Sequence, residues 1–248
     1  MLGIGGGIIF VPSLYFLLPY TGLDHSLVPY YAISISLFAG AISASFSSIL
    51  HFLMGNVDIR RALLFASGSA LTAFFSVMFI SYVGPVFLKV IFAGVLFIIA
   101  IVMFRDSHLN KELVKRDNAI NDYALPIVGL FVGILSAFTG LGGGIIFFPV
   151  LHYLLLLKPK IAIGTSSVIT AITMIFASFS FFIHGSDWMG DYNLSSTYLA
   201  VAIPLGLGAV SGARIGVSFI KNMKSLMAKK IFSILLIIVV IKIIFGLW

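Results

Sequence analysis

Long apolar segments dominate the chain and restrict the folds that are open to it. The clearest of them, residues 28–54, 62–83 and 162–184, are long enough to cross the roughly 30 Å hydrocarbon core of a membrane as α-helices. Only 9% of the 248 residues are charged, against about 25% in soluble domains. Because the apolar runs are continuous rather than alternating, they predict an all-α integral membrane protein and not an outer-membrane barrel.

One short run of sequence occurs twice. Residues 3–14 read GIGGGIIFVPSL and residues 140–151 read GLGGGIIFFPVL, with nine of the twelve aligned positions identical. A glycine weakens a helix by about 1 kcal/mol relative to alanine, so a glycine cluster between apolar segments is costly. The likeness continues downstream, where residues 32–36 (AISIS) match residues 162–166 (AIGTS). The sequence therefore predicts a duplication in which the glycine motif has a shared role.

The duplication divides the chain into three predicted parts. Residues 1–104 form a first transmembrane repeat, residues 105–123 a polar linker, and residues 124–248 a second transmembrane repeat. The apolar arm that precedes the second glycine motif has no counterpart before the first. This indicates either a start that is truncated by about half a helix or a genuinely shortened first repeat.

Loop charges orient the two repeats, because Lys and Arg concentrate in the cytoplasmic loops of membrane proteins. Twelve of the fifteen basic residues lie in four segments, residues 55–61, 105–123, 158–160 and 218–230. Residues 21–27 and 185–195 carry none. If the basic segments are cytoplasmic, the linker is cytoplasmic too and the two repeats have opposite orientations in the membrane.

Residues 124–157 begin and end on this same side, so the segment must enter the membrane and return. Its two arms contain about 15 and 13 residues, or roughly 20 Å each, which is short of the hydrocarbon thickness. We therefore expect a re-entrant hairpin with the glycines at its tip, although two short tilted crossings satisfy the same charges. The predicted fold is two inverted repeats, each with a glycine-tipped hairpin followed by three transmembrane helices, the first hairpin lacking its first arm.

The two glycine clusters are the main candidates for a binding site. They comprise Gly5, Gly6, Gly7, Gly142, Gly143 and Gly144. Backbone that leaves a helix at membrane depth must be buried in protein or line a wet cavity, and the helix that starts there directs free N–H groups and a positive partial charge at the tip. Such an end favours an anion, and two inverted copies would face each other near the midplane. The alternative is that the glycines only permit close helix packing.

Hydroxyl and basic side chains extend this candidate site. Ser34, Ser36, Thr165 and Ser166 follow the glycine motifs at corresponding places. Their hydroxyls would donate to an oxyanion, or would bond back to their own helices. His51 and Arg214, near the ends of their spans, are further candidates for substrate contact, with an interfacial or snorkelling position as the alternative.

Several classes of function are disfavoured. All eight acidic residues lie in loops or at the ends of spans, so no carboxylate is placed to bind a cation or relay protons inside the membrane. The chain has no cysteine and its histidines are scattered, which argues against a metal site. The glycine pattern lacks the strand–helix context of a dinucleotide fingerprint, so we expect no cofactor. The sequence contains no stripe of basic and aromatic residues of the kind that contacts nucleic acids, so we expect no nucleic-acid partner.

Several motifs together resemble one known family. GIGGGIIFVP and GLGGGIIFFP, the AIGTS segment, HFLMGNVD at residues 51–58 and Gly212-Ala213-Arg214 are similar to the TauE/SafE sulfite exporter family over nearly the whole chain. The resemblance implies a membrane permease for sulfite, sulfonates or related organosulfur anions. The first half has no counterpart of Gly-Ala-Arg near residues 70–74, so any contact of Arg214 with substrate would lack a symmetric partner.

The sequence thus predicts a secondary transporter, not an enzyme, that exports a small sulfur-containing anion. We expect a multi-pass protein of the cell membrane whose partners are the anion and the lipid bilayer. The sequence is compatible with a homo-oligomer but does not specify the oligomeric state. Export of a divalent anion is downhill by about 2.3 kcal/mol per charge per 100 mV and needs no coupling ion. The rival hypotheses are a permease for another small anion such as a carboxylate and, from a different class, an intramembrane Ser/His hydrolase.

Overall fold

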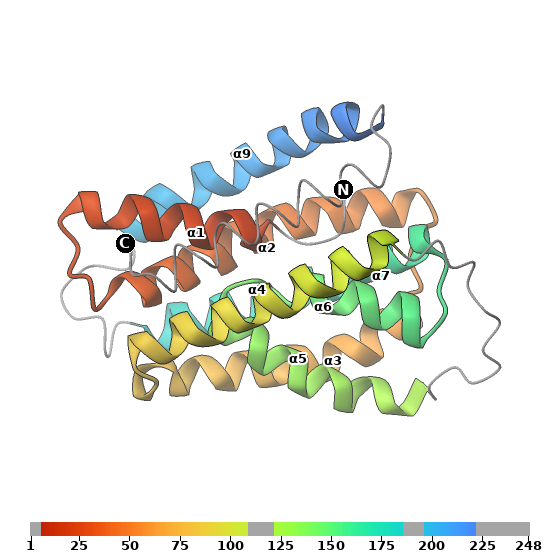
Figure 1. Cartoon of the computed structure of the whole chain (residues 1–248), viewed down its shortest axis with the longest axis horizontal. Helices are drawn as coiled ribbons and strands as arrows, with labels where there is room; N and C mark the ends of the chain where they lie inside the picture. Colours follow the sequence, from red (N-terminus) through yellow and green to blue (C-terminus); the bar gives the residue numbers. More distant parts are fainter. Residues whose placement is uncertain (1–5, 109–121, 186–195, 222–248) are drawn as a thin grey trace.

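A computed structural model of the chain describes residues 6–108, 122–185 and 196–221 (Figure 1). Within these ranges every regular element is a helix. The helices run roughly along the long axis of the molecule (Figure 1). This confirms the all-α class that the continuous apolar segments predict.

The helices match the predicted spans closely. The first half contains α1 (Gly7–Leu17), α2 (Val28–Leu53), α3 (Ile59–Phe79) and α4 (Pro85–His108). The second half contains α5 (Leu125–Thr139), α6 (Gly144–Pro149), α7 (Pro159–His184) and α9 (Ser196–Lys221). Short 3₁₀ turns cover Leu18–Thr21, Ile80–Tyr82 and Asp122–Ala124, and a π-helix, Val150–Leu154, follows α6. Residues 226–248, a further apolar segment that the sequence predicts as the last transmembrane helix of the second repeat, lie outside the described residues, and α4 extends into the segment predicted as linker.

Local sequence explains where several helices begin. Pro29, Pro126 and Pro159 lie in the first turns of α2, α5 and α7, where a missing N–H costs nothing and the fixed φ suits a helix. The side chain of Asp58 caps α3 by accepting a hydrogen bond from the N–H of Arg61 at 3.1 Å. The loops between the apolar runs therefore contain the signals that start the next helix.

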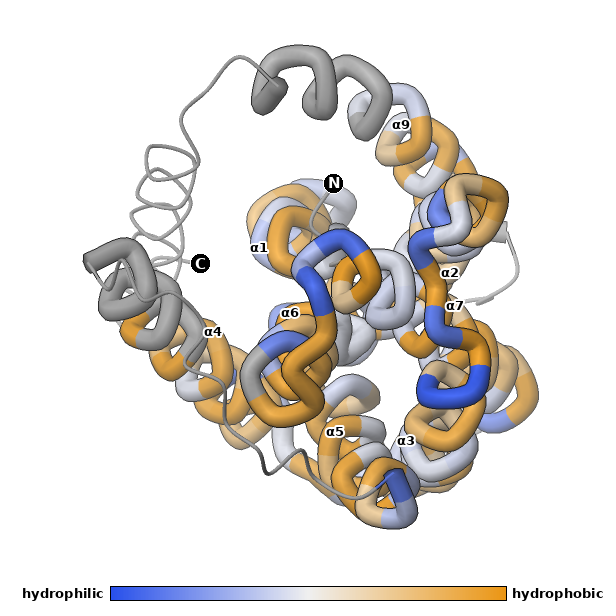
Figure 2. The backbone as a smooth tube through the Cα atoms, turned by 90° about the vertical axis from the view of Figure 1, so that its right-hand side faces the viewer, coloured by the Kyte–Doolittle hydropathy of each residue, from blue (hydrophilic) through white to orange (hydrophobic). Residues whose placement is uncertain are grey.

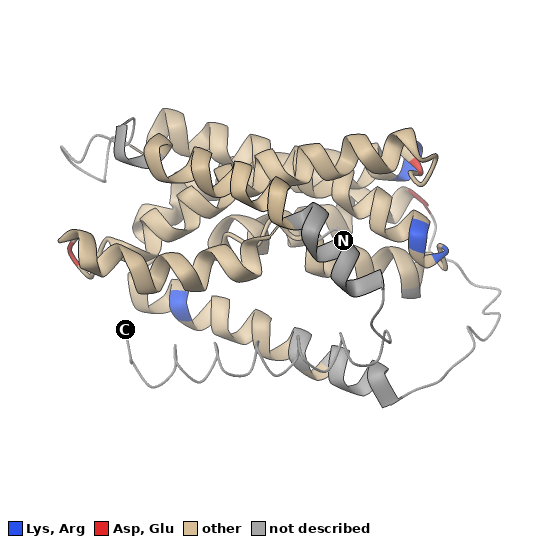
Figure 3. Ribbon diagram, turned by 90° about the horizontal axis from the view of Figure 1, so that it is seen from above, with Lys and Arg blue, Asp and Glu red and all other residues tan. Residues whose placement is uncertain are grey.

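Four described segments are long and apolar enough to cross a membrane, namely Val28–Leu53, Ile59–Tyr82, Asp122–Thr139 and Pro159–His184. Viewed along the bundle, the helices consist mainly of hydrophobic residues, and hydrophilic residues gather in connecting segments at the end of the bundle (Figure 2). Most of the described charged side chains lie at the two ends of the molecule (Figure 3). These features fit helices that are surrounded by lipid and loops that face water.

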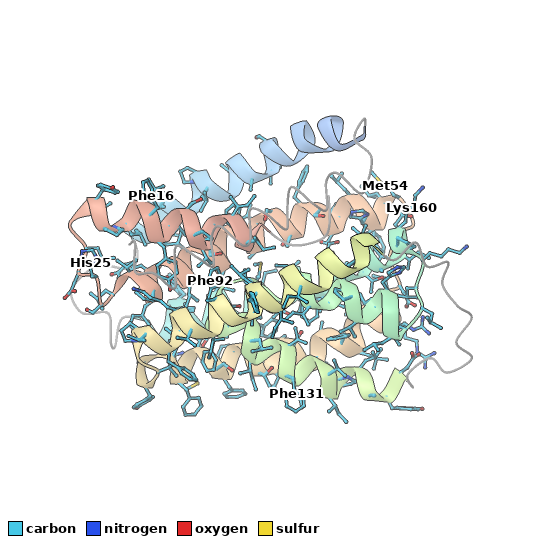
Figure 4. All side chains as sticks on the ribbon, in the orientation of Figure 1. Phe16, His25, Met54, Phe92, Phe131 and Lys160 are labelled. Atoms are coloured by element: carbon cyan, nitrogen blue, oxygen red, sulfur yellow. The ribbon has the colours of Figure 1, made fainter. Side chains whose placement is uncertain are left out.

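The two halves interlock in the centre of the molecule. Helices α2 and α7 pack against each other. They run in opposite directions, since α2 leads from the end near His25 to the end near Met54, and α7 starts near Lys160 at that second end (Figure 4). Helix α3 packs against α5 and α7 of the second half, and α9 packs against α2 of the first half. The antiparallel α2–α7 pair agrees with inverted repeats; the inversion of the complete repeats stays a prediction.

Small residues bring α3 and α5 into direct backbone contact. A Cβ atom on Gly68 would overlap the carbonyl of the first turn of α5, and Cβ atoms on Gly129 or Gly133 would overlap backbone atoms of α3. The hydroxyl of Thr72 donates to the carbonyl oxygen of Leu130 at 2.8 Å. Close approach at small residues and hydroxyl bonds between helices are the usual means of helix association in membranes.

Candidate functional site

Residues 122–158 form a hairpin that returns to the end of the molecule where it starts. At the start of α5, the Nε of Arg61 donates to the carboxylate of Asp122 at 3.0 Å. Near the start of α7, the N–H of Asp58 donates to the Thr165 hydroxyl at 2.9 Å. Because Asp58 caps α3 and Arg61 lies in its first turn, the two ends of the hairpin lie together. This geometry suits both a re-entrant hairpin and two short tilted crossings.

Three glycines build the turn at the tip of this hairpin. Gly140, Gly142 and Gly143 have φ values of +69°, +70° and +71°. This is the left-handed region, which side chains disfavour and glycine adopts freely. The glycine cluster is therefore needed by the backbone of the tip, and not only by helix packing.

The two copies of the glycine motif build the same helix start. Gly6 caps α1 with φ +80°, and Gly143 caps α6 with φ +71°. A Cβ atom on Gly6 would lie 2.7 Å from the ring of Phe10, and a Cβ atom on Gly143 would lie 2.7 Å from the ring of Phe147. These residues hold the same positions in the two twelve-residue runs. The sequence duplication is thus also a duplication of local structure.

The two tips touch each other. A Cβ atom on Gly7 would lie 2.7 Å from the carbonyl oxygen of Gly140 and 2.8 Å from the Cα of Leu141. Gly140 also lies against the backbone of Ile33 in α2, and the Ser36 hydroxyl donates to the Gly140 carbonyl at 2.9 Å. These contacts are about 10 Å along α2 from its start at 1.5 Å per residue. The tips therefore meet inside the helix bundle, away from its ends.

Two helix starts lie at or near this meeting point. Helix α1 begins at Gly7 and α6 at Gly144, and the N–H groups of a first turn have no partner within their own helix. Each helix start carries a positive partial charge. Among the acidic side chains that the structure describes, Asp24, Asp58 and Asp122 all lie outside the long helices. The described carboxylates are thus positioned away from the tips.

The structure separates the four hydroxyls that the sequence grouped. The Ser34 and Ser166 hydroxyls donate to carbonyl oxygens of their own helices at 3.0 and 2.9 Å. The Thr165 hydroxyl accepts a hydrogen bond from the Asp58 N–H, at the end of the molecule where the hairpin starts and returns. Ser36 reaches the second glycine tip, through its bond to the carbonyl of Gly140.

The remaining predicted site residues lie apart from the tips or outside the described part. His51 lies in the last turn of α2, about 22 Å along the helix from Ser36, with its Cβ atom facing Gly164 of α7. Its Nδ1 is buried and has no hydrogen-bond partner among the described residues. Gly5 is outside the described residues, and so is the side chain of Arg214 in α9.

Sequence reasoning missed other hydroxyls near the second tip. Thr170 and Ser136 are fully buried, on α7 and α5 respectively, and Ser69 of α3 forms a 2.7 Å hydrogen bond with Thr173. Thr170, Thr173 and Ser69 belong to helices with many serines and threonines, whereas Ser136 is one of two hydroxyl residues in α5. Only the rotation of each helix, which the sequence does not specify, distinguishes them from their neighbours.

Comparisons with known proteins agree with this architecture. A family model described as sulfite exporter TauE/SafE matches residues 1–243. The probable membrane transporter protein YunE of Bacillus subtilis is 27% identical, over 96% of this chain and 89% of its own length. A probable membrane transporter protein of Haemophilus influenzae is also 27% identical, over 97% of this chain and 90% of its own.

A more distant relative is archaeal. The probable membrane transporter protein MJ0441 of Methanocaldococcus jannaschii is 24% identical, over 88% of this chain and 79% of its own length. No solved structure matches the chain. The family match spans nearly all of the sequence, and the apolar helices are those of a multi-pass membrane protein. The chain therefore belongs to the sulfite exporter TauE/SafE family of membrane transporters.

Proposed function

We propose that this transporter exports sulfite, a sulfonate or a related small organosulfur anion from the cell, and that the anion binds beside the point where the two glycine tips meet. The observation that carries the proposal is the backbone contact of Gly7 with Gly140 and Leu141. It brings the starts of α1 and α6 to one region inside the bundle. That the two copies of a duplicated motif meet at one place supports a ligand shared by both.

The chemistry of the tips suits transport rather than tight binding. Backbone N–H groups and a helix dipole stabilise an anion without a full opposing charge. A permeating ion must bind well enough to enter and weakly enough to leave. Partial charges at two helix starts meet both requirements, whereas a buried lysine or arginine would hold the anion more strongly.

The charge distribution supports the direction of transport. Arg60, Lys158 and Lys160 are exposed at the end of the molecule where the hairpin of residues 122–158 starts and returns. If this end is cytoplasmic, as the loop charges predict, a positive rim there attracts anions from the cytoplasm. Outward movement of a divalent anion then gains about 2.3 kcal/mol per charge per 100 mV of inside-negative potential.

The substrate class rests on the description of the family and on the chemistry of the tips. The family is described as sulfite exporters, whereas the names of the three relatives specify only membrane transport. A carboxylate would accept hydrogen bonds from the same donors. A panel of anions is therefore needed to separate these substrates.

The decisive experiment is flux in proteoliposomes containing the purified protein, measured with sulfite, methanesulfonate and acetate. Gly7→Ala is the informative variant, because the alanine suits a helix but its Cβ atom would push against the second tip. We expect saturable flux of the sulfur anions, lost in Gly7→Ala. Gly84→Ala is the matched control, since no described atom lies within 4 Å of that Cβ position.

Two results would count against the proposal. Acetate flux without flux of either sulfur anion would reject the substrate class. Normal sulfite flux in Gly7→Ala would reject a site between the tips while leaving the substrate class intact.

A further inference from the structure

Two hydroxyls near the second tip lack the hydrogen bonds that buried hydroxyls normally have. The Thr170 side chain is 0% exposed and the Ser136 side chain 1%. Neither hydroxyl oxygen has a hydrogen-bond partner among the described residues. A buried polar group without a partner destabilises a protein appreciably, so two of them close to one structural feature require an explanation.

Thr170 faces the turn at the tip. The side chain of Met174, one turn further along α7, fills the space beside Gly142, where an added Cβ atom would overlap it. Residues four positions apart on a helix share a face. Thr170 therefore lies on the same side of α7 as Met174, one turn before the contact with Gly142.

Ser136 faces the same tip from α5. The side chain of Val132, one turn earlier on α5, would lie 3.1 Å from a Cβ atom on Gly143. Ser136 follows Val132 by four residues and so shares its face. Its carbonyl also accepts the N–H of Gly140 at 3.0 Å, which places Ser136 directly before the turn. Both hydroxyls thus approach the second tip, one from each helix that flanks it.

Thr173 shows the commoner arrangement of a buried hydroxyl on α7, although Ser178 on the same helix also lacks a partner among the described residues. Thr173, three residues after Thr170 and equally buried, donates to the Ile169 carbonyl at 2.8 Å and pairs with Ser69. Serine and threonine in membrane helices commonly bond back to their own helix in this way. Thr170 and Ser136 lie in the same kind of helix, but their hydroxyls form no hydrogen bond with the described residues.

We propose that Thr170 and Ser136 donate hydrogen bonds to oxygen atoms of the transported sulfur oxyanion at the second glycine tip. This inference rests on the proposed function and extends its site to two residues on α7 and α5. Alignment of residues 32–36 with residues 162–166 places Gly40 opposite Thr170, so the first repeat has no corresponding hydroxyl.

The test compares two isosteric substitutions on one helix, Thr170→Val and Thr173→Val. Both are made in the full chain, with sulfite flux in proteoliposomes and melting temperature as readouts. Thr170→Val removes a hydroxyl without a partner, so we expect an equal or higher melting temperature without sulfite and a KM for sulfite that is about tenfold higher. Thr170→Ser should restore the KM, and Ser136→Ala should raise it.

Thr173→Val is the matched control, because its hydroxyl already has partners. We expect a lower melting temperature with an unchanged KM. Sulfite should raise the melting temperature of the wild-type protein more than that of Thr170→Val.

The possible failures are distinguishable. If the wild-type protein moves neither sulfite nor methanesulfonate, the proposed function fails and this inference falls with it. If the wild-type protein transports sulfite and Thr170→Val has the same KM, only the hydroxyl subsite is rejected. A lower melting temperature in Thr170→Val with an unchanged KM would assign the hydroxyl a structural role.

Discussion

Replacing Gly143 with alanine tests whether the second tip is as tightly built as its geometry indicates. Gly143 has φ +71°, and an alanine Cβ atom would lie 2.7 and 2.8 Å from two ring atoms of Phe147. Gly55, in the loop after α2, has a similar φ of +67° but no described atom within 4 Å of its Cβ position. The two substitutions therefore share the backbone strain, and only Gly143→Ala adds a steric overlap.

The expected free energies of unfolding follow from these two contributions. A left-handed conformation costs an alanine about 1–2 kcal/mol. Overpacking in a well-packed interior adds about 1–3 kcal/mol. The Phe147 ring is fully buried and packs edge-on against Phe65 with 5.0 Å between ring centroids, so it has little room to move away. We expect Gly55→Ala to destabilise the protein by about 1–2 kcal/mol and Gly143→Ala by about 2–5 kcal/mol.

Unfolding in mixed micelles with increasing SDS, followed by loss of helical circular dichroism, measures both values. A double-mutant cycle with Phe147→Leu isolates the overlap, because the smaller side chain should relieve much of the cost of Gly143→Ala. Equal destabilisation by Gly55→Ala and Gly143→Ala would refute the argument, since it would show that the Phe147 ring yields without cost.

Three further predictions concern packing, capping and pH. Gly68→Ala should weaken α3–α5 packing by about 3 kcal/mol in the same unfolding assay, whereas Gly94→Ala, whose Cβ position is open among the described residues, should be neutral or stabilising. Asp58→Ala removes the cap of α3 and should cost about 1 kcal/mol in that assay; an unchanged unfolding midpoint would contradict the capping role. The Ser26 N–H lowers the pKa of Asp24, so the contribution of this carboxylate to stability is complete above its unfolded pKa of about 3.9 and disappears as pH falls through the folded pKa. Asp24→Asn should remove this part of the acid dependence of the melting temperature; an identical acid dependence in both proteins would argue against it.

The sequence predicts the helices well because their signals are local. The segment 28–54 corresponds to α2, which the structure gives as Val28–Leu53, and the segment 162–184 corresponds to α7, Pro159–His184. Apolar length, first-turn prolines and loop charges are all visible without knowledge of the fold. The glycine tip is also predictable, because a cluster of glycines needs a backbone reason in so apolar a chain.

The detailed site is harder to predict because it depends on helix rotation and long-range packing. Ser34 and Ser36 are two residues apart and therefore lie on different sides of α2; the Ser36 hydroxyl bonds to the second tip, and the Ser34 hydroxyl bonds to a carbonyl of its own helix. The bond between Thr165 and Asp58 joins residues 107 positions apart. Nothing in the local pattern around either residue indicates such a partner.

One repeated residue leads to two different structures. Pro12 lies within α1, which continues to Leu17, whereas its counterpart Pro149 ends α6 and a π-helix follows. In that second copy His152 stacks on Phe148 and its Nδ1 contacts the carbonyl of Leu157 at 2.9 Å. The twelve-residue match predicts the shared helix start but not the divergence beyond it.

The exchange of helices between the halves bears on how such a chain arises in evolution. Helix α3 is buried against α5 and α7, and α9 against α2, so each half covers a helix of the other. A half-length ancestor with this packing would have buried its third helix only against a second copy running in the opposite direction. Gene fusion would then have joined two subunits that already depended on each other. The same dependence predicts that half-chains separated within residues 109–121 are unstable alone and reassemble when they are made together.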